Sequence, residues 1–355
     1  MPNDRQFCEA MLPKVSRTFA LCIRLLPHDL EYPVLVAYLL CRIADTIEDN
    51  PTLDGATKRQ LLHEFARCVG RETTAQAIEQ VFADQRNDAE RLAHNASAVL
   101  REYDGFPQSY RECIRPWVQE MCHGMASFAS LQSGDAQSDF HALSSVEELD
   151  EYCYYVAGTV GHMLTDLYRA VRPQITAERH RDLKQLATSF GLGLQLTNII
   201  KDVADDQARG WSFVPHELCQ NAGIRPDQLQ DERFAFQARQ VMNELIDKAQ
   251  RHLQDAREYC LHLPHRQYGI RLFCLTSMFF AVRTLRLARH DPQLLDPGHK
   301  VKISRRDVYW TVACSAIVAT SNQAIRTYYR YLLGAQDIMT PLAAESPRIP
   351  TFERR

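Results

Sequence analysis

FGLGLQLTNIIKDVADD, residues 190–206, joins a mostly apolar run to an acidic cluster. Asp202, Asp205 and Asp206 stand at i, i+3 and i+4, which are neighbouring positions on one face of a helix. Three like charges about 6 Å apart repel one another, at a cost on the order of 3 kcal/mol for each pair. The run before them is more apolar than a surface helix tolerates. We therefore expect these carboxylates to project from a buried helix into a cavity.

A second acidic cluster, Asp45, Glu48 and Asp49, has the same internal spacing and follows the apolar run VLVAYLLC at 34–41. Acidic runs are usually solvated helix faces, but the apolar flanks of both clusters argue against that interpretation here. Oxygen ligands with no Cys or His beside them favour Mg²⁺ over zinc. Because Mg²⁺ is commonly held by a few carboxylates plus substrate phosphates, the pattern predicts a ligand that carries a phosphate or diphosphate.

The composition excludes several classes of protein. With 355 residues, a net charge of −3 and no Lys/Arg block, the chain has no electrostatic signature of nucleic-acid binding. Its 11 cysteines are an odd number without a C-x-x-C pair, which is typical of small buried thiols in a reducing cytosol. The N-terminus lacks the features of a secretory signal, and no apolar run approaches the roughly 20 residues that span a bilayer. We expect a soluble, cytoplasmic protein.

Amphipathic helical periodicity recurs along almost the whole chain, so the sequence predicts an all-α fold. Ser145 and Glu148 form a capping-box pattern at the start of one helix. No low-complexity linker divides the chain, and a cavity shared by both acidic clusters requires one domain; we expect it to cover residues 1–337, followed by a polar tail at 338–355. Between proline and glycine breaks, helices are expected at 6–25, 31–50, 56–70, 85–103, 107–132, 146–171, 176–207, 227–262, 266–290 and 304–334.

Basic side chains near the acidic clusters could bind the diphosphate oxygens that metal ions leave free. They are Arg17 within Ser16-Arg17-Thr18-Phe19, Arg42, Lys201 and Arg209. Any one of them alone is more often a surface or ion-pair residue. Their proximity in sequence to both clusters favours diphosphate binding.

Four motifs in this order resemble the head-to-head prenyl synthases, meaning the squalene and phytoene synthases, over roughly residues 15–335. They are Ser16-Arg17-Thr18-Phe19, Tyr38-x-x-x-Arg42-x-x-Asp45-x-x-Glu48-Asp49, the segment from Tyr152 to Gly161, and Gln195-x-x-Asn198-Ile199-Ile200-Lys201-Asp202-x-x-Asp205-Asp206. The resemblance implies a single all-helical bundle with a central apolar channel. It also implies Mg²⁺-dependent condensation of two isoprenyl diphosphates.

The resemblance further implies roles for individual residues. All six acidic residues would bind Mg²⁺, and Tyr152 would handle the proton and stabilise cations, although a core tyrosine is an equal alternative from position alone. We expect Asp45, Asp49, Asp202 and Asp206 to be catalytic together with Tyr152. Phe19, Phe273 and Leu275 are candidates for a dry channel, whereas Met278, Phe279, Phe280 and His162 are more simply packing residues. The expected substrate contacts are Ser16, Arg17, Phe19, Tyr38, Arg42, Gln195, Asn198, Lys201, Arg209 and Phe273.

The segment Val301-Lys302-Ile303-Ser304-Arg305-Arg306 resembles the NADPH-associated segment of the squalene synthase branch. Basic side chains at a helix start could bind the cofactor's phosphates, so Lys302, Arg305 and Arg306 are the expected NADPH contacts. The string Tyr152-Cys153-x-Tyr155-Val156-Ala157-Gly158 also favours this branch. The resemblance then implies that two farnesyl diphosphates yield squalene through presqualene diphosphate, in sterol or hopanoid biosynthesis.

Three departures from the family pattern stand out. Lys201 replaces a common arginine, Ser304 replaces a basic residue, and the membrane anchor of the eukaryotic enzymes is missing. The last point indicates a soluble bacterial type, for which we expect peripheral contact at the inner membrane face because the product partitions into lipid. The oligomeric state and the length of the prenyl chain stay open.

Three other functions compete with this interpretation. The protein could be an NADPH-independent dehydrosqualene or phytoene synthase, or an enzyme that stops at presqualene diphosphate. It could also be a non-catalytic assembly factor with a synthase-like fold. Such factors tend to lose the acidic clusters, and all six carboxylates are present here.

Overall fold

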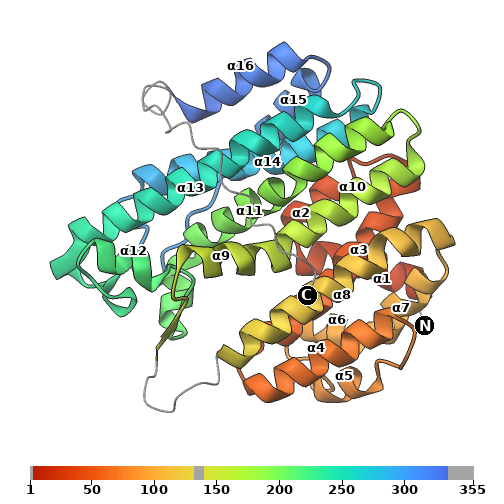
Figure 1. The fold of residues 1–355 in the computed structure, drawn as a ribbon, viewed down its shortest axis with the longest axis horizontal. Helices are drawn as coiled ribbons and strands as arrows, with labels where there is room; N and C mark the ends of the chain where they lie inside the picture. The colour runs from red at the N-terminus through yellow and green to blue at the C-terminus, as the bar shows by residue number, and fades with distance from the viewer. Residues whose placement is uncertain (1–2, 132–139, 335–355) are drawn as a thin grey trace. The chain divides into compact units, whose positions relative to one another are not determined.

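Helices make up nearly all of the regular structure in the computed structural model, which describes residues 3–131 and 140–334 (Figure 1). The prediction of an all-α protein is confirmed. One pair of two-residue strands occurs in the described part of the chain, β1 (His141–Ala142) beside β2 (Trp211–Ser212). The expected polar tail at 338–355 lies outside the described residues. No helix within 3–131 or 140–334 is long and apolar enough to cross a bilayer.

The helices group into two compact units, and each is described by itself. The first unit comprises residues 1–135 and 159–181, with α3 against α6, α7 and α8, and with α8 against α4 and α10. Leu39 and Leu40 of α3 are fully buried, as expected from the apolar run before the first acidic cluster. Its helices are α1 (Asp4–Val15), α2 (Arg17–Ile23), α3 (His28–Glu48), α4 (Gly55–Val69), α5 (Gln76–Val81), α6 (Asp88–His94), α7 (Ala96–Asp104), α8 (Gln108–Leu131) and α10 (Thr159–Val171).

The second unit comprises residues 136–158 and 182–355, and α14 packs against α13, α15 and α16 in it. It contains β1, β2 and most of the long helix α11 (Ala177–Ala208). Its other elements are α9 (Val146–Cys153), the π-helix η1 (Tyr154–Gly158), α12 (His216–Asn221), the 3₁₀ turns η2 (Pro226–Gln228) and η3 (Glu232–Phe234), α13 (Ala235–His262), α14 (Tyr268–His290), α15 (Arg305–Val318) and α16 (Asn322–Leu333).

Several expected helices are divided in the structure. Ser16 ends the expected helix 6–25, because its backbone is extended (φ −157°) and its Oγ accepts a hydrogen bond from the Phe19 backbone N at 3.2 Å. Ser321 ends the helix expected over 304–334 in the same way, by capping α16. A short polar side chain that caps a helix competes with continuation of the helix before it. The range 85–103 is likewise split near Asn95, and α5 and α12 were not expected.

A fully buried arginine, Arg271 of α14, joins the ends of three other helices. Its Nη1 donates to the Leu263 carbonyl just after α13 at 2.7 Å, its Nε to the Ala319 carbonyl just after α15 at 2.8 Å, and its Nη2 to Asn322 Oδ1 of α16 at 2.8 Å. Carbonyls at helix C-terminal ends lack partners within their helix and carry partial negative charge. The N–H groups of the buried guanidinium therefore donate to oxygen atoms whose partial negative charge favours a cation.

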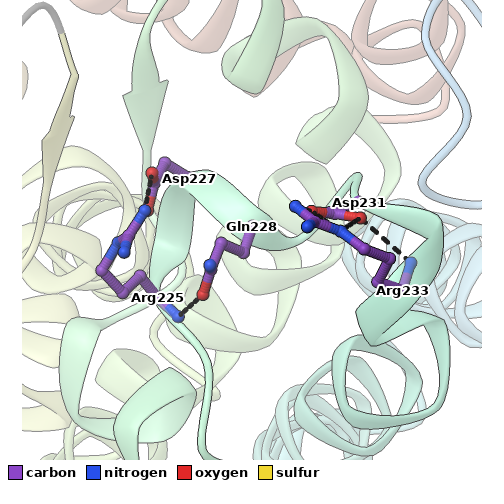
Figure 2. A network of polar contacts seen from close by, with 5 residues as sticks. All are labelled: Arg225, Asp227, Gln228, Asp231 and Arg233. Atoms are coloured by element: carbon purple, nitrogen blue, oxygen red, sulfur yellow. Dashed lines mark hydrogen bonds and ion pairs between the residues drawn. The ribbon is translucent and has the colours of Figure 1, made fainter.

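The connection from α12 to α13 is held by local polar contacts (Figure 2). Arg225 pairs with Asp227 at 2.8 Å and donates its backbone N–H to Gln228 Oε1 at 2.9 Å, and Arg233 pairs with Asp231 at 2.5 Å. Gln207, in the last turn of α11, donates from Nε2 to the Pro226 carbonyl at 3.1 Å. This loop therefore supports the end of α11, where the second acidic cluster lies.

Buried His252 of α13 predicts a pH dependence of stability. Burial lowers the pKa of His252 to about 3, with the charges of Lys248 and Arg251 acting in the same direction. An unfolded histidine titrates near 6.5, so below that pH the unfolded chain binds a proton that the native state does not bind, and stability is lost as pH falls. Lowering the pH from 7 to 5 should therefore cost about 2 kcal/mol of unfolding free energy through this residue.

Urea denaturation at both pH values measures this effect. The loss of stability should be about 2 kcal/mol smaller in His252→Gln than in the wild type. His28→Gln, which changes a fully exposed histidine, should keep the wild-type dependence. Parallel losses in His252→Gln and the wild type would contradict the prediction.

Candidate active site

The first acidic cluster occupies the last turn of α3. Asp45 lies in this turn, Glu48 is the last helical residue, and Asp49 is the C-cap. The C-terminal end of a helix carries partial negative charge, so three carboxylates there repel the helix as well as one another. Arg42 of the preceding turn pairs with Asp45 at 3.6 Å. Arg42 and Lys58 of α4 oppose this repulsion with two positive charges.

Burial dominates the titration behaviour of the first cluster. Burial raises the pKa of Asp45 to about 7, the charge of Asp49 adds to the shift, and Arg42 opposes it. Lys58 of α4 is buried near this cluster. Burial lowers the pKa of Lys58, whereas the charges of Glu48 and Asp49 act to raise it. Sequence reasoning missed Lys58, because its proximity to the cluster arises only from the packing of α4.

The expected substrate contacts before the first cluster gather around Tyr38. The ring centroids of Phe19 and Tyr38 are 5.5 Å apart. Burial raises the pKa of Tyr38 to about 12, whereas a hydrogen bond with Ser16 and the charge of Arg42 act to lower it. Arg17 is exposed. The buried Nε of Arg42 has no hydrogen-bond partner among the described residues. A buried guanidinium N–H without an acceptor fits a site for an anionic ligand.

The second acidic cluster also lies at a helix C-terminal end, in the last two turns of α11. Each carboxylate has a different cationic partner in the second unit. Asp202 pairs with Lys201, Asp206 pairs with Arg209, and Asp205 pairs with Lys300, which lies just before α15. Lys201 and Arg209 were expected at this site, whereas Lys300 was missed because it is 95 positions from Asp205. Carboxylates interleaved with ammonium and guanidinium groups form a surface that suits a metal–diphosphate ligand.

Gln195 and Asn198 continue this polar surface along α11. The side chains of Gln195, Asn198, Asp202 and Asp205 are all half-buried, and their spacing of three or four residues places them on one face. Asn198 Nδ2 lies 3.5 Å from Gln195 Oε1. The helix thus presents amides and carboxylates along a single stripe.

Tyr152 is buried in the last turn of α9, and its ring stacks on Phe213 with centroids 4.7 Å apart. Phe213 directly follows β2, which pairs with β1, and β2 begins shortly after α11 ends. Within the second unit, these contacts connect Tyr152 to the chain just beyond the second acidic cluster.

The other apolar candidates lie in buried or half-buried surroundings. Phe273 is buried on α14, as are Leu275, Met278 and Phe279, all three of them fully. His162 stacks on Trp117 at 4.8 Å, as a packed helix residue would.

A basic hollow of about 670 Å³ adjoins the second cluster through Lys300, which both pairs with Asp205 and lines the hollow. Of the three residues expected to bind NADPH, Lys302 lines this hollow, whereas Arg305 and Arg306 are exposed and are not among its lining residues. The other charged residues or histidines that line it are Arg283, Arg286, His290, Asp291, His299 and Asp307. Four permanent cations face two carboxylates, so the hollow suits an anionic ligand.

The acidic side chains fit a magnesium ion that is shared with a ligand. Within residues 3–131 and 140–334, no group of three or more Asp, Glu, His or Cys side chains is arranged to hold a metal ion by itself. Mg²⁺ is commonly bound through one or two carboxylates plus substrate phosphates rather than by a complete protein cage. The partial carboxylate sets and the unpartnered Nε of Arg42 suit such a shared site.

Comparison with known proteins gives consistent results. Residues 12–307 match the family model of squalene/phytoene synthase. Squalene synthase 1 of Arabidopsis thaliana is 30% identical over 295 residues, which are 81% of this chain and 66% of that protein. The solved complex of TcSQS with the ligand E5700 is similar with a TM-score of 0.76 and 26% identity, covering 94% of this chain and 93% of that chain.

A dehydrosqualene synthase solved with a ligand has a TM-score of 0.62 and 22% identity, covering 92% of this chain and 96% of that chain. This likeness concerns the fold alone. The chain spans just under two thirds of the length of three curated squalene synthases that it matches, from 63% to 66%.

Proposed function

Because the chain belongs to the squalene/phytoene synthase family, we propose that it condenses two farnesyl diphosphates and reduces the product to squalene with NADPH. The first product would be presqualene diphosphate, formed by head-to-head joining. The observation that carries the proposal is the C-terminal end of α11, where Asp202, Asp206 and Asp205 pair with Lys201, Arg209 and Lys300 respectively. Both signs of charge are needed to hold a diphosphate together with its metal ions.

In this proposal each acidic cluster serves one diphosphate. Asp45, Glu48 and Asp49 would hold Mg²⁺ in the first unit, and Asp202, Asp205 and Asp206 would hold it in the second. Bound Mg²⁺ neutralises the charge that develops on a leaving diphosphate. Arg42, Lys201 and Arg209 contribute fixed positive charge, and Asn198 and Gln195 contribute neutral hydrogen bonds.

The condensation needs an ionised allylic substrate, a nucleophilic double bond and an acceptor for one proton. Loss of diphosphate from one farnesyl diphosphate gives an allylic cation, the double bond of the other attacks it, and loss of a proton closes the cyclopropane ring. We assign Tyr152 to this proton and to cation stabilisation. Its burial and the stacked ring of Phe213 support the assignment, because an aromatic, water-poor surface protects a carbocation from capture as an alcohol.

The reduction step is assigned to the basic hollow. NADPH bound there would supply a hydride to the cation that forms when presqualene diphosphate loses its diphosphate. Lys302, Arg283 and Arg286 supply charge for the cofactor's phosphates, and the volume of about 670 Å³ is within the usual range for ligand pockets. Lys300 lies between this hollow and Asp205, which brings the proposed cofactor site next to one proposed diphosphate site.

Incubation with farnesyl diphosphate and Mg²⁺, with and without NADPH, tests the proposal by mass spectrometry of the extracted products. Squalene is expected only with NADPH, and presqualene diphosphate is expected to accumulate without it. Dehydrosqualene formed equally under both conditions would replace the proposal by the NADPH-independent synthase. Presqualene diphosphate that persists with NADPH would limit the activity to the first half-reaction.

Changing Lys302 should affect the two half-reactions differently. We expect Lys302→Gln to raise the KM for NADPH about tenfold, because a hydrogen bond to a charged group contributes roughly 1.5–3 kcal/mol. Formation of presqualene diphosphate should stay within twofold of the wild type. Steady-state kinetics of each half-reaction, with exposed Lys14→Gln as the matched control, measures the difference. Equal losses in both half-reactions would argue against a cofactor contact.

A further inference from the structure

Large apolar side chains are exposed mainly on α15 and α16. Among described residues, five large hydrophobic side chains are more than half exposed, and four of them lie on these two helices. They are Tyr309 (73%), Trp310 (58%), Ile317 (73%) and Tyr331 (66%), and the fifth is Phe236 (72%) on α13. Single exposed hydrophobic residues are ordinary, but a group on adjacent helices indicates an interaction surface.

The exposed residues of α15 form one face of the helix. Thr311, Ser315 and Val318 are buried, and they share the side that packs against α14. The opposite side is exposed and consists of Arg305, Arg306, Tyr309, Trp310, Ala313 and Ile317. A surface helix normally places polar residues toward solvent, whereas here the exposed face is apolar beyond its first turn. We call these six residues the α15 face.

Positive charge is concentrated beside this apolar surface. Residues 300–334 contain six basic residues, Lys300, Lys302, Arg305, Arg306, Arg326 and Arg330, and one acidic residue, Asp307, which gives a net charge of +5 in a chain of net charge −3. Asp307 points away from the α15 face, because it pairs with Arg283 of α14 and Ser304. The α15 face therefore carries two arginines and no acidic residue.

We propose that the α15 face binds the surface of an anionic lipid bilayer. Tyr and Trp prefer the boundary between headgroups and acyl chains, Ile317 would enter the acyl region, and Arg305 and Arg306 would contact lipid phosphates. Arginines at one end of an exposed helix face and aromatic residues beside them supply the basic and interfacial groups that bind membrane surfaces. The charge of the face favours an anionic surface, because the negative surface potential of such a bilayer attracts both arginines.

Co-sedimentation of the full chain with vesicles tests the proposal without any need for turnover, so the result is independent of the proposed reaction. Binding is expected to vesicles of phosphatidylcholine with 30% phosphatidylglycerol, and to be at least tenfold weaker with phosphatidylcholine alone. Each arginine near an anionic surface contributes roughly a fivefold factor, so Arg305→Gln with Arg306→Gln should weaken partitioning roughly 25-fold. High salt should have a similar effect on the wild type.

The apolar part of the face is tested by the triple variant Tyr309→Ser, Trp310→Ser and Ile317→Ser, which should abolish sedimentation with anionic vesicles. Phe236→Ser is the matched control, because it removes an equally exposed aromatic residue from another helix. It should bind as the wild type does. Anionic vesicles should also shift the tryptophan emission of the wild type to shorter wavelength, and this shift should be lost in Trp310→Phe.

Three results would overturn the proposal. The first is a triple variant and an arginine variant that both bind as the wild type does, and the second is a wild type that binds neither vesicle. The third is a wild-type dimer that the triple variant converts to a monomer, since the face would then contact a second copy of the chain. If the triple variant does not fold, the arginine variant and the salt dependence decide.

Discussion

Asp202→Asn is expected to lower kcat/KM for farnesyl diphosphate at least a thousandfold, which corresponds to about 4 kcal/mol of lost transition-state stabilisation. The substitution keeps the shape of the side chain but removes the charge that pairs with Lys201 and that would hold Mg²⁺. The measurement is the rate of presqualene diphosphate formation at saturating Mg²⁺. Asp45→Asn should have an effect of similar size, because Asp45 is the equivalent residue of the first cluster.

The same variant separates catalysis from folding. An acidic residue near a helix C-terminus is unfavourable to the helix, so removing the charge of Asp202 should leave the melting temperature unchanged or slightly higher. Asp231→Asn is the matched control: it makes the same change in a loop carboxylate that pairs with Arg233 (Figure 2), and its activity should stay within twofold. Asp202→Asn with activity within tenfold of the wild type would refute the metal assignment.

Local sequence pattern predicts those parts of the site that belong to one helix. The spacing of Asp202, Asp205 and Asp206 is enough to predict a shared helix face, and the apolar run before them is enough to predict burial. The same argument holds for Asp45 and Glu48. Neither prediction needs knowledge of the neighbouring helices, because the period of the helix determines which residues are adjacent.

Partners from other helices could not be predicted in this way. Lys300 pairs with Asp205 across 95 positions, and Lys58 approaches Glu48 and Asp49 only because α4 packs beside the end of α3. Both are ordinary lysines in sequence. Their positions depend on loop paths and helix packing, which leave no periodic signal.

The N-cap of α15 separates the basic residues of the segment 301–306 into two groups. The resemblance to the NADPH-associated segment implied one cofactor site for Lys302, Arg305 and Arg306. Ser304 is the N-cap of α15 and accepts a hydrogen bond from the Asp307 backbone N at 3.1 Å, so Lys302 precedes the helix whereas both arginines lie in its first turn. As a result Lys302 lines the basic hollow, and Arg305 and Arg306 belong to the exposed α15 face.

The motif from Tyr152 to Gly161 has a structural role that its residues alone did not predict. It contains the π-helix η1, whose backbone packs directly against α11 at Gly191. A Cβ atom on residue 191 would lie 2.3 Å from the Ala157 carbonyl oxygen and 2.6 Å from the Gly158 backbone N. These are backbone atoms, so no side-chain rotation can relieve the contact. Glycine at 191 therefore allows η1 and α11 to approach closely.

Gly191→Ala is accordingly expected to lower the free energy of unfolding by about 3 kcal/mol or more, the upper part of the range for overpacked interiors. Urea denaturation measures the change. Gly105→Ala is the control, because the nearest atoms to its Cβ would be the carbonyl oxygens of Glu102 at 3.4 Å and Arg101 at 3.6 Å, and its backbone is already right-handed helical. It should be neutral or slightly stabilising. Because η1 begins two residues after Tyr152, Gly191→Ala should also reduce condensation even at temperatures where the variant is folded. A variant with wild-type stability and rate would show that the helices separate at little cost.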